Sequence, residues 1–505
     1  MITDARPPKI YKLFRGYGTI VVCCIAGSLG IWLLFFQNLG DRDLWSSHEA
    51  RSGLNARTML ETGIWWLPGR TIETPDVQKP PMYYWLVALI SGNATEVNNW
   101  TIRLPSVLGA LVCLASVILI GHSLGNRKTG LLAAIVLGTA IHFIWSARIG
   151  RIDMPLAAAT TLYGLFAIRY TLTWSTWDLV WASISVMIAI LLKGPIGLVF
   201  CGASGLAVWI TLSRQFFSLP GLAFTGILGV GLSLPWFLYA HLATEGEFTQ
   251  HFFIEHNWDR GLGTGRLRSH PFWFYPVQFL WDFQPWPSLG LLLILINIKK
   301  LNLNIYKLFE FKSIKFTSLI WLLLLFLVLS ISNFKRSDYL IVAYPACSLF
   351  FGSFINSISI INSSKIIYNS LSLAFLFCVI ITFLIISWLI FFDIPNNEAN
   401  RDVKTWAKKI NLLMPIDEPV LFFGEEAHAL AFHLNRPHRI LGKPEELCSC
   451  LSIHKPSWVI TNPQVLSLWP NGPPGTQWVM EDSAIQGLDG QKHHKPLVLL
   501  KAFPQ

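Results

Sequence analysis

Long apolar runs alternate with short polar segments along residues 1–392 of the chain. Runs of roughly 18 or more apolar residues are typical of helices that cross a hydrocarbon core about 30 Å thick. The pattern therefore predicts an all-α polytopic membrane protein with about 11–13 transmembrane helices. The clearest runs lie at Gly16–Gln37, Thr101–His122, Thr129–Ser146, Pro155–Thr173, Trp177–Leu192, Pro195–Leu212, Leu219–His241, Phe274–Ile296, Phe316–Ile331, Tyr339–Asn356 and Ile366–Phe391. A shorter apolar piece, Tyr83–Ile90, favours a re-entrant or interfacial helix.

Residues 393–505 have a different pattern, in which short apolar stretches alternate with amphipathic ones. We expect helices at Arg401–Leu412 and Glu425–Leu434, and strands at Pro419–Gly424, Ser457–Thr461 and Pro496–Phe503. This alternation predicts a small C-terminal α/β domain behind a transmembrane domain at residues 1–392. The domain has neither a Gly-x-Gly-x-x-Gly motif nor a nucleophile elbow, which favours an accessory role.

Composition supports the membrane prediction, because 53% of the 505 residues are hydrophobic and only 13% are charged. An ordinary soluble protein has about a quarter of its residues charged. The net charge of +10 is spread over loops and forms no basic patch, so we expect no nucleic-acid partner.

The distribution of Lys and Arg predicts the orientation of the chain, since these residues favour cytoplasmic loops. In the expected topology Arg6–Arg15, Arg127–Lys128 and Lys299–Lys315 all lie on the side of the N-terminus, which is therefore expected to be cytoplasmic. The other side receives most of the groups that could do chemistry. They lie in residues 41–100 and in Ser146–Pro155, Leu191–Pro195, Leu242–Trp273 and Ser332–Tyr339.

The polar loop at residues 41–100 is the strongest candidate for a catalytic loop. Its Ser46–Glu49 stretch has the Ser-x-x-Glu pattern of a helix start and Gly63 marks a helix end, so we expect an interfacial helix at about Ser47–Thr62. A carboxylate held near the membrane surface can act as a general base toward an acceptor hydroxyl. Glu49 fits this role, although it could instead only cap the helix, and Asp43 is the competing base.

Cations on the same expected side indicate an anionic ligand. Arg51 shares a helix face with His48 by its spacing, and its guanidinium suits a phosphate. Lys79 precedes two prolines that stiffen the backbone, and the Tyr84 that follows suits a membrane interface. Lys193 joins two apolar runs, so it is either a turn residue or a second phosphate contact.

Other polar groups add to this set of candidates. Lys335 and Arg336 form a basic cluster on the side where basic residues are disfavoured, and Asp153 stands just before an apolar run. The loop after His241 holds His256 and His270 among several potential metal ligands, but their spacing matches no tight zinc pattern. A divalent metal is therefore possible but not supported, and the sequence requires no cofactor.

Several motifs together resemble one family of enzymes. Along Asp41–Gly352 they read HEAR, MLETGIWWLP, QKPPMYYW, IRLPS, LLKGPIGL, PWFLYAH, FFIEHNWDRGLG, HPFWFYP and YLIVAYPA. The chain is similar to the polyprenyl-phosphate-sugar glycosyltransferases of the GT-C fold. This group includes the lipid A aminoarabinose transferase and relatives of the protein O-mannosyltransferases.

The resemblance implies an inverting transfer of one sugar from a polyprenyl-phosphate donor, such as an undecaprenyl-phosphate sugar. The acceptor would be a glycolipid, glycan or protein of the envelope, at the periplasmic face of a bacterial inner membrane. The resemblance further implies that Arg51, Lys79 and Lys193 contact the donor phosphate. It also implies that Asp153, His256 and His270 line the cavity, and from their positions in the sequence we expect Tyr84, Lys335 and Arg336 to line it as well.

One position departs from the family pattern. Relatives typically carry Asp-Glu before Ala-Arg-Tyr, whereas this chain has His48-Glu49 and has Ser52 in place of the Tyr. His48 thus occupies the position of the family's catalytic Asp, so that Glu49 inherits the base role most simply and Asp43 comes second.

Two other functions compete with sugar transfer. An inactive paralogue that serves in an envelope assembly complex is one alternative, motivated by His48. A transporter or flippase for the same kind of lipid is another, but it would favour ionisable residues near mid-membrane.

Overall fold

The structure is a computed structural model. It describes residues 25–71, 74–213, 218–259, 270–297, 313–361, 365–399, 401, 403–415, 418–425, 427–451, 457–474, 476–484 and 496–504. The helices of the first part are η1 (Trp32–Phe36), α2 (Ser47–Thr62), α3 (Met82–Ser91), η2 (Ala94–Glu96), α4 (Asn99–Ser123), α5 (Arg127–Gly138), α6 (Ile141–Ala147), α7 (Asp153–Thr173), α8 (Thr176–Lys193), α9 (Pro195–Leu212), α10 (Ser218–Ala243), α11 (Glu247–Thr249), η3 (Gln250–Asp259), α13 (Phe274–Asp282), α14 (Trp286–Asn297), α15 (Ile314–Ile331), η5 (Ser337–Ala343), α16 (Tyr344–Ile361), α17 (Lys365–Trp388), η6 (Leu389–Asp393) and α18 (Ile394–Ala399).

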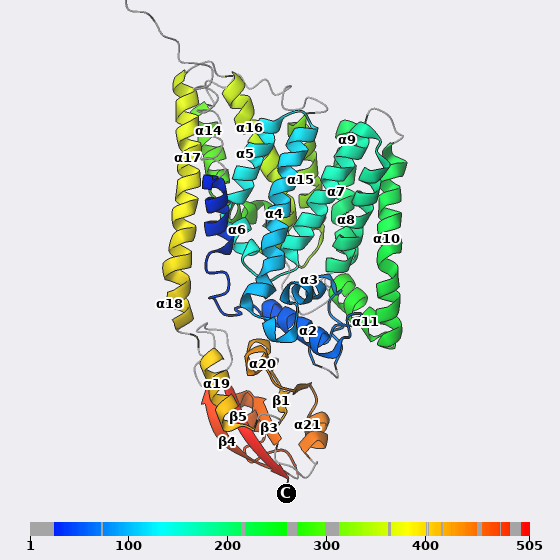
Figure 1. Ribbon diagram of the computed structural model, residues 1–505, viewed down its shortest axis with the longest axis vertical. Coiled ribbons are helices and arrows are strands. Elements are labelled where there is room, and N and C mark those ends of the chain that lie inside the picture. Colours follow the sequence, from blue (N-terminus) through cyan, green and yellow to red (C-terminus); the bar gives the residue numbers. More distant parts are fainter. Residues whose placement is uncertain are drawn as a thin grey trace, which may run out of the picture.

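The long helices stand side by side as a bundle, with α17 at one edge and α10 at the other (Figure 1). Their outer faces expose large apolar side chains such as Leu232, Leu323 and Leu376, as expected of surfaces that face lipid. Within the described residues, seven helices are long and apolar enough to cross a membrane, or eight if the bent pair α5 and α6 forms one span. The protein is therefore a mostly helical, multi-pass membrane protein.

The difference from the eleven expected spans has local causes. Part of Gly16–Gln37 lies outside the described residues, and α7 is rich in Ala, Thr and Tyr, so it is less apolar than the seven spans. Thr129–Ser146 is bent by 70° into α5 and α6, and Phe274–Ile296 is split into α13 and α14. The two breaks meet, since the Ile141 amide donates to the Gln284 carbonyl at 3.0 Å. This bond satisfies backbone groups that lipid could not.

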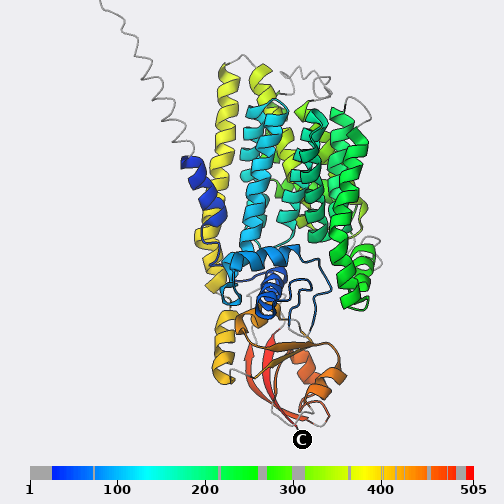
Figure 2. The same cartoon turned by 45° about the vertical axis from the view of Figure 1, so that its right-hand side comes forward.

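Two short helices close one end of the bundle. Figure 2 shows α3 lying across the ends of the long helices with α2 next to it. α2 has the expected bounds, because the Ser46 hydroxyl caps its start and Gly63, with φ of 71°, ends it in the left-handed region. α3 is the short apolar helix expected near Tyr83–Ile90.

Close helix contact within the bundle depends on glycine. A Cβ on Gly121 of α4 would stand 2.4 Å from the Cα of Gly130 on α5. Only a hydrogen at both positions allows these two backbones to approach so closely.

The C-terminal part is a small domain with a five-stranded sheet of order β2-β1-β3-β5-β4. β1 is parallel to β2 and β3, whereas β5 is antiparallel to β3 and β4. The domain contains α19 (Val403–Leu413), β1 (Val420–Phe423), α20 (His428–Leu434), β2 (His438–Leu441), α21 (Pro444–Leu451), β3 (Ser457–Thr461), α22 (Pro463–Leu468), β4 (Thr476–Ala484) and β5 (Leu497–Pro504). The strand β4 was not expected. It follows the Pro- and Gly-rich residues 470–475 and carries exposed Val479 and Met480.

Candidate active site

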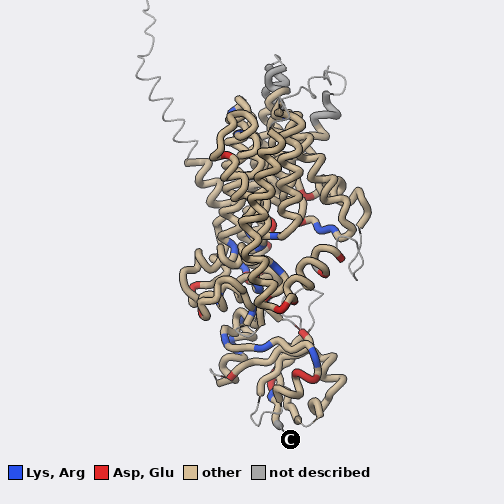
Figure 3. The backbone as a smooth tube through the Cα atoms, turned by 90° about the vertical axis from the view of Figure 1, so that its right-hand side faces the viewer, with Lys and Arg blue, Asp and Glu red and all other residues tan. Residues whose placement is uncertain are grey.

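A polar cavity of about 140 Å³ lies at the end of the bundle that α2 and α3 close. It draws its walls from α2, from the segment before α3, from the start of α7, from the end of α8 and from the region of η5. Its lining residues are Ser47, His48, Arg51, Ser52, Gln78, Lys79, Tyr84, Arg151, Ile152, Asp153, Lys193, Arg336 and Tyr339. Figure 3 shows few charged residues in the upper part of the bundle and more at its lower end and in the C-terminal domain.

The Asp153 carboxylate is held between two cations of the cavity wall. Its Oδ1 lies 2.6 Å from Lys193 Nζ, and its Oδ2 lies 3.0 Å from Arg151 Nη2. The side chain of Asp153 is only 5% exposed. Because α7 begins at this residue, the partial positive charge of the helix N-terminus also stabilises the carboxylate. Asp153 thus fixes the positions of Lys193 and Arg151.

A second carboxylate, Asp338, pairs with Arg151 and with a further cation, Arg336. Its Oδ2 lies 2.8 Å from Arg151 Nη1 and 3.2 Å from Arg336 Nη2. Lys193 Nζ also lies 3.7 Å from the centre of the Tyr339 ring, a cation–π distance. The pairs immobilise three cations around one space, which lowers the ordering cost of binding an anion.

The opposite wall is organised around the buried Asp76. Its Oδ2 accepts from Asn55 at 2.9 Å and from the Tyr84 hydroxyl at 3.1 Å, and Arg51 Nε lies 3.7 Å away. Burial disfavours the charged form of Asp76, but the Arg51 and Arg70 charges outweigh it and lower the pKa of this carboxyl. Asp76 therefore orients Arg51 and Tyr84 at the cavity.

His48 lies in the cavity beside these cations. Burial and the positive charges of Arg151 and Lys79 lower the pKa of His48 to about 3. The imidazole is therefore neutral at physiological pH, and without a bound anion to offset these charges it is a weak base.

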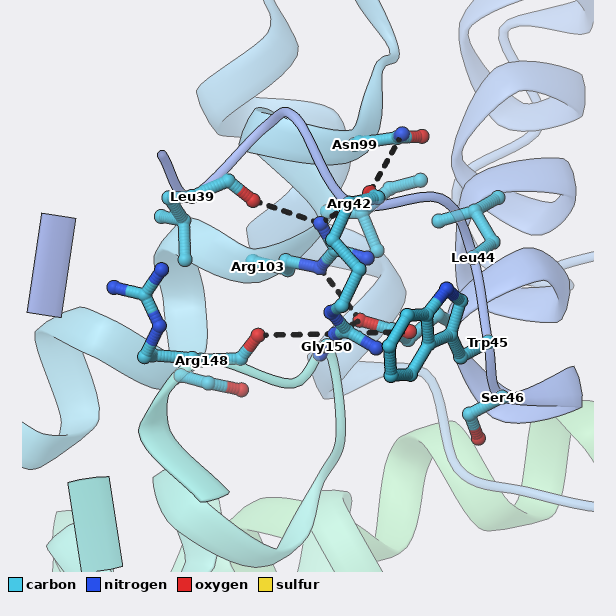
Figure 4. A network of polar contacts seen from close by, with 12 residues as sticks. Leu39, Arg42, Leu44, Trp45, Ser46, Asn99, Arg103, Arg148 and Gly150 are labelled. Carbon is cyan, nitrogen blue, oxygen red and sulfur yellow. Dashed lines mark hydrogen bonds and ion pairs between the residues drawn. The ribbon is translucent and has the colours of Figure 1, made fainter. Parts of the chain in front are cut away.

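Glu49, the first candidate base, is held in a buried ion cluster and is not a lining residue of the cavity. It is 0% exposed, and its Oε1 accepts from Arg103 Nε at 2.7 Å and from Arg42 Nη2 at 3.1 Å. The Gly150 amide donates to the same oxygen at 2.9 Å. Figure 4 shows Arg42, Arg103 and Gly150 converging on this point.

This cluster changes the role that Glu49 can have. Burial alone would raise the pKa of Glu49, but the charges of Arg103 and Arg42 hold it at about 2. Arg42, Arg103 and the Gly150 amide occupy its oxygens, so they are not available to accept a proton from a group bound in the cavity. It does not cap α2 either, since Ser46 does so. Its bond to the Gly150 amide instead fixes the segment that leads to Arg151.

The remaining candidates also lie apart from the cavity lining. Asp43 is 1% exposed and its Oδ1 lies 2.6 Å from His433 Nε2 of the C-terminal domain. Lys335 donates to the carbonyl of His270 at 3.0 Å, so both residues stabilise the end of α15. His256 belongs to η3, and its side chain lies outside the described residues. In the described part of the chain, no group of three or more His, Cys, Asp or Glu could hold a metal ion.

The cavity contains residues that the sequence did not single out, above all Arg151. Its spacing of two from Asp153 was the available signal, but Arg148 has a similar position in the sequence. The structure separates the two, because Arg148 donates to the carbonyls of Leu34 and Gln37. The lining thus has five cationic side chains, Arg51, Lys79, Arg151, Lys193 and Arg336, and one carboxylate, Asp153. Asp76 and Asp338, which do not line the cavity, also pair with three of these cations, and the cations remain in excess. This excess favours a small, strongly anionic group such as a phosphate.

Comparison with known proteins gives a consistent set of relatives. A family model described as dolichyl-phosphate-mannose-protein mannosyltransferase matches residues 78–239. An uncharacterised protein of Aquifex aeolicus is 30% identical over 355 residues, which is 70% of this chain and 66% of that protein. The undecaprenyl phosphate-alpha-4-amino-4-deoxy-L-arabinose arabinosyl transferase of Wigglesworthia glossinidia brevipalpis is 24% identical over 344 residues, 67% of this chain and 59% of the relative. The chain therefore spans less than two thirds of the length of these two relatives.

Among solved structures, ArnT from Cupriavidus metallidurans bound to undecaprenyl phosphate is similar along nearly its whole length. The TM-score is 0.72 at 16% identity, with 95% of this chain and 98% of that chain covered. At this identity the likeness establishes the fold, and it includes the bundle and the small C-terminal domain.

Proposed function

Because the chain belongs to the GT-C glycosyltransferase family, we propose that it transfers a sugar from a polyprenyl-phosphate donor to an acceptor of the bacterial cell envelope. The observation that carries this proposal is the cavity with five cations and one carboxylate at the end of an apolar helix bundle. A lipid-linked phosphate requires both surfaces, an apolar one for its tail and a cationic one for its headgroup.

The cations have separate tasks in this proposal. Arg51, Lys79 and Lys193 contact the donor phosphate, and Arg336 and Arg151 add positive charge to the same space. The phosphate is the leaving group, and it gains negative charge as its bond to the sugar breaks. Fixed cations stabilise that charge in the transition state, where it counts most.

His48 is the proton acceptor that fits the cavity best, because it lines the cavity and because the charge of a bound donor phosphate offsets the cations that lower its pKa in the free protein. The acceptor hydroxyl attacks the anomeric carbon of the sugar, a new glycosidic bond forms, and the bond from that carbon to the phosphate oxygen breaks. The hydroxyl proton passes to the neutral imidazole and the lipid phosphate leaves as an anion. Attack from the side opposite the phosphate inverts the anomeric centre.

The place of the reaction follows from the charge bias of the loops. The cavity lies at the bundle end away from the start of α5, where Arg127 and Lys128 stand in a loop expected to be cytoplasmic. We therefore assign the cavity and the C-terminal domain to the periplasmic side of the inner membrane, with the N-terminus in the cytoplasm. The acceptor is a glycolipid, a glycan or a protein that reaches this face.

The test uses purified protein in detergent or nanodiscs, a series of polyprenyl-phosphate sugars and candidate acceptors, with released polyprenyl phosphate as the readout. Wild type should consume at least one donor, Lys79→Ala and Lys193→Ala should raise the donor KM, and His48→Ala should lower kcat. Lys409→Met, which changes a lysine far from the cavity, is the control. If no donor is consumed, sugar transfer is ruled out in favour of an inactive paralogue; donor movement across proteoliposomes without release would favour a flippase.

A further inference from the structure

Two faces of α2, the helix that carries His48, contact different parts of the molecule. His48, Arg51 and Ser52 point toward the cavity. Glu49, Gly53 and Arg57 follow each other at intervals of four residues, so they share a different face of α2. Glu49 holds the arginine cluster, while the C-terminal domain meets the rest of this second face.

α20 of the C-terminal domain packs directly on that face. A Cβ on Gly53 would lie 2.6 Å from Cε2 of the Phe432 ring, and also 2.6 Å from Cδ1 of Ile102 on α4. Arg57 donates to the Phe432 carbonyl at 2.9 Å, and its guanidinium lies 4.2 Å from the centre of the Phe432 ring. Gly53 therefore allows both α20, through Phe432, and α4, through Ile102, to pack closely against α2.

A polar contact joins α20 to the segment that leads into α2. His433, next to Phe432, places Nε2 2.6 Å from Asp43 Oδ1, and Lys404 Nζ lies 4.0 Å from the same oxygen. Asp43 is almost fully buried, so its negative charge depends on these partners. The His433 contact and the other hydrogen bonds to Asp43 lower the pKa of this carboxyl despite its burial.

The end of the last long helix adds a third contact to the segment before α2. Glu398 Oε2 of α18 accepts from the Asp43 amide at 3.1 Å and from Trp45 Nε1 at 2.8 Å. Trp45 in turn lies 5.0 Å from the guanidinium of Arg42, which binds Glu49. Residues of α18 and α20 thus contact both the side of α2 and the segment that precedes it.

We propose that the C-terminal domain is a positioning element of the active site, which through Asp43–His433 and Gly53–Phe432 sets where α2 holds His48 and Arg51. This inference rests on the proposed function for its catalytic consequence. Asp43, Gly53, Arg57 and His433 are positioning residues, because none of them lines the cavity. Displacement of a reacting group by about 1 Å can reduce a rate by a factor on the order of 100.

The first experiment adds one methyl group in the full-length protein. Gly53→Ala should push α20 away from α2 and lower kcat/KM about 10- to 100-fold, with more rapid hydrogen exchange of the α2 amides. Adding Phe432→Ala removes the clash with α20 and leaves the one with Ile102, so the part of the activity and of the exchange protection that the double variant recovers measures the contribution of α20. A general folding defect would not be reversed by a second truncation.

The second experiment removes only the polar contact. His433→Gln and Asp43→Asn should each lower kcat/KM, and the double variant should lose little more than either single variant, because both break one interaction. The pH dependence assigned to His48 should keep its shape in all of them. Lys409→Met is the matched control, since it breaks the 2.8 Å pair with Asp482 inside the domain without touching α2.

The outcomes separate the two proposals. Wild-type rates and unchanged α2 exchange in Gly53→Ala and His433→Gln would overturn the positioning role. If wild type consumes no donor, the proposed function fails, while the exchange measurements still decide whether the C-terminal domain holds α2. Should Gly53→Ala not accumulate as folded protein, His433→Gln carries the test.

Discussion

Two neighbouring residues, His48 and Glu49, differ completely in what their surroundings let them do. His48 faces the cavity as a neutral imidazole, whereas Glu49 is an ionised carboxylate enclosed by Arg42, Arg103 and Gly150. One helical step of about 100° separates their directions. The chemistry of α2 therefore depends on which face each residue takes.

Replacing Glu49 should affect stability first. Glu49→Gln leaves two buried arginines without a counter-charge, which we expect to cost about 3–5 kcal/mol of unfolding free energy. The pKa of Glu49 in the folded protein, about 2, lies below its usual 4.5. The ionised carboxylate therefore stabilises the fold fully above pH 4.5. The contribution is lost as the pH falls from 4.5 to 2. Thermal unfolding in detergent at several pH values measures it, and the variant should lack this acid-dependent component; an identical acid profile would contradict the role.

Donor binding should change the proton affinity of His48. In the free protein, burial, Arg151 and Lys79 lower the pKa of His48 to about 3. A bound phosphate offsets those charges, so the pKa should rise in the complex. Activity falls where the base is protonated, and the acid limb of kcat should therefore lie at higher pH than that of kcat/KM. Rate profiles from acidic to mildly alkaline pH test this, and His48→Ala should lose the limb of kcat.

At the scale of elements, the α4–α5 contact predicts where a single methyl group is tolerated. Gly121→Ala should destabilise the protein by about 1–3 kcal/mol, because its Cβ would meet the backbone of Gly130 at 2.4 Å. A Cβ on Gly202 of α9 would meet nothing within 4 Å, so Gly202→Ala should be neutral or slightly stabilising. Thermal unfolding of both variants in one detergent decides the matter; equal melting temperatures would show that the helices move apart freely.

Elements governed by local signals were predictable from the sequence. α2 has its expected bounds because Ser46 and Gly63 act within one turn of its ends. The breaks in Thr129–Ser146 and Phe274–Ile296 were not foreseen, since each is satisfied by the other across the bundle. The pattern of apolar residues along one segment does not reveal a hydrogen-bond partner in another segment.

At the scale of the whole molecule, topology predicted the convergence of Arg51, Lys79 and Lys193 on one side, and the structure brings all three to one cavity. What topology could not predict is the pairing of charges. Glu49 meets Arg103, 54 residues away, and Asp43 meets His433, 390 residues away. Those partners, and not the residue types, separate a buried structural acid from a base.

The cavity wall is also spread over most of the chain, from Ser47 to Tyr339. Because the chain is synthesised from its N-terminus, the residues of α2 are made well before Lys193 and Arg336. The cavity can therefore be completed only after Tyr339 has been synthesised, and α20 can pack on α2 only after that. A nascent or truncated chain would hold the first half of the site with no means of acting on the lipids around it.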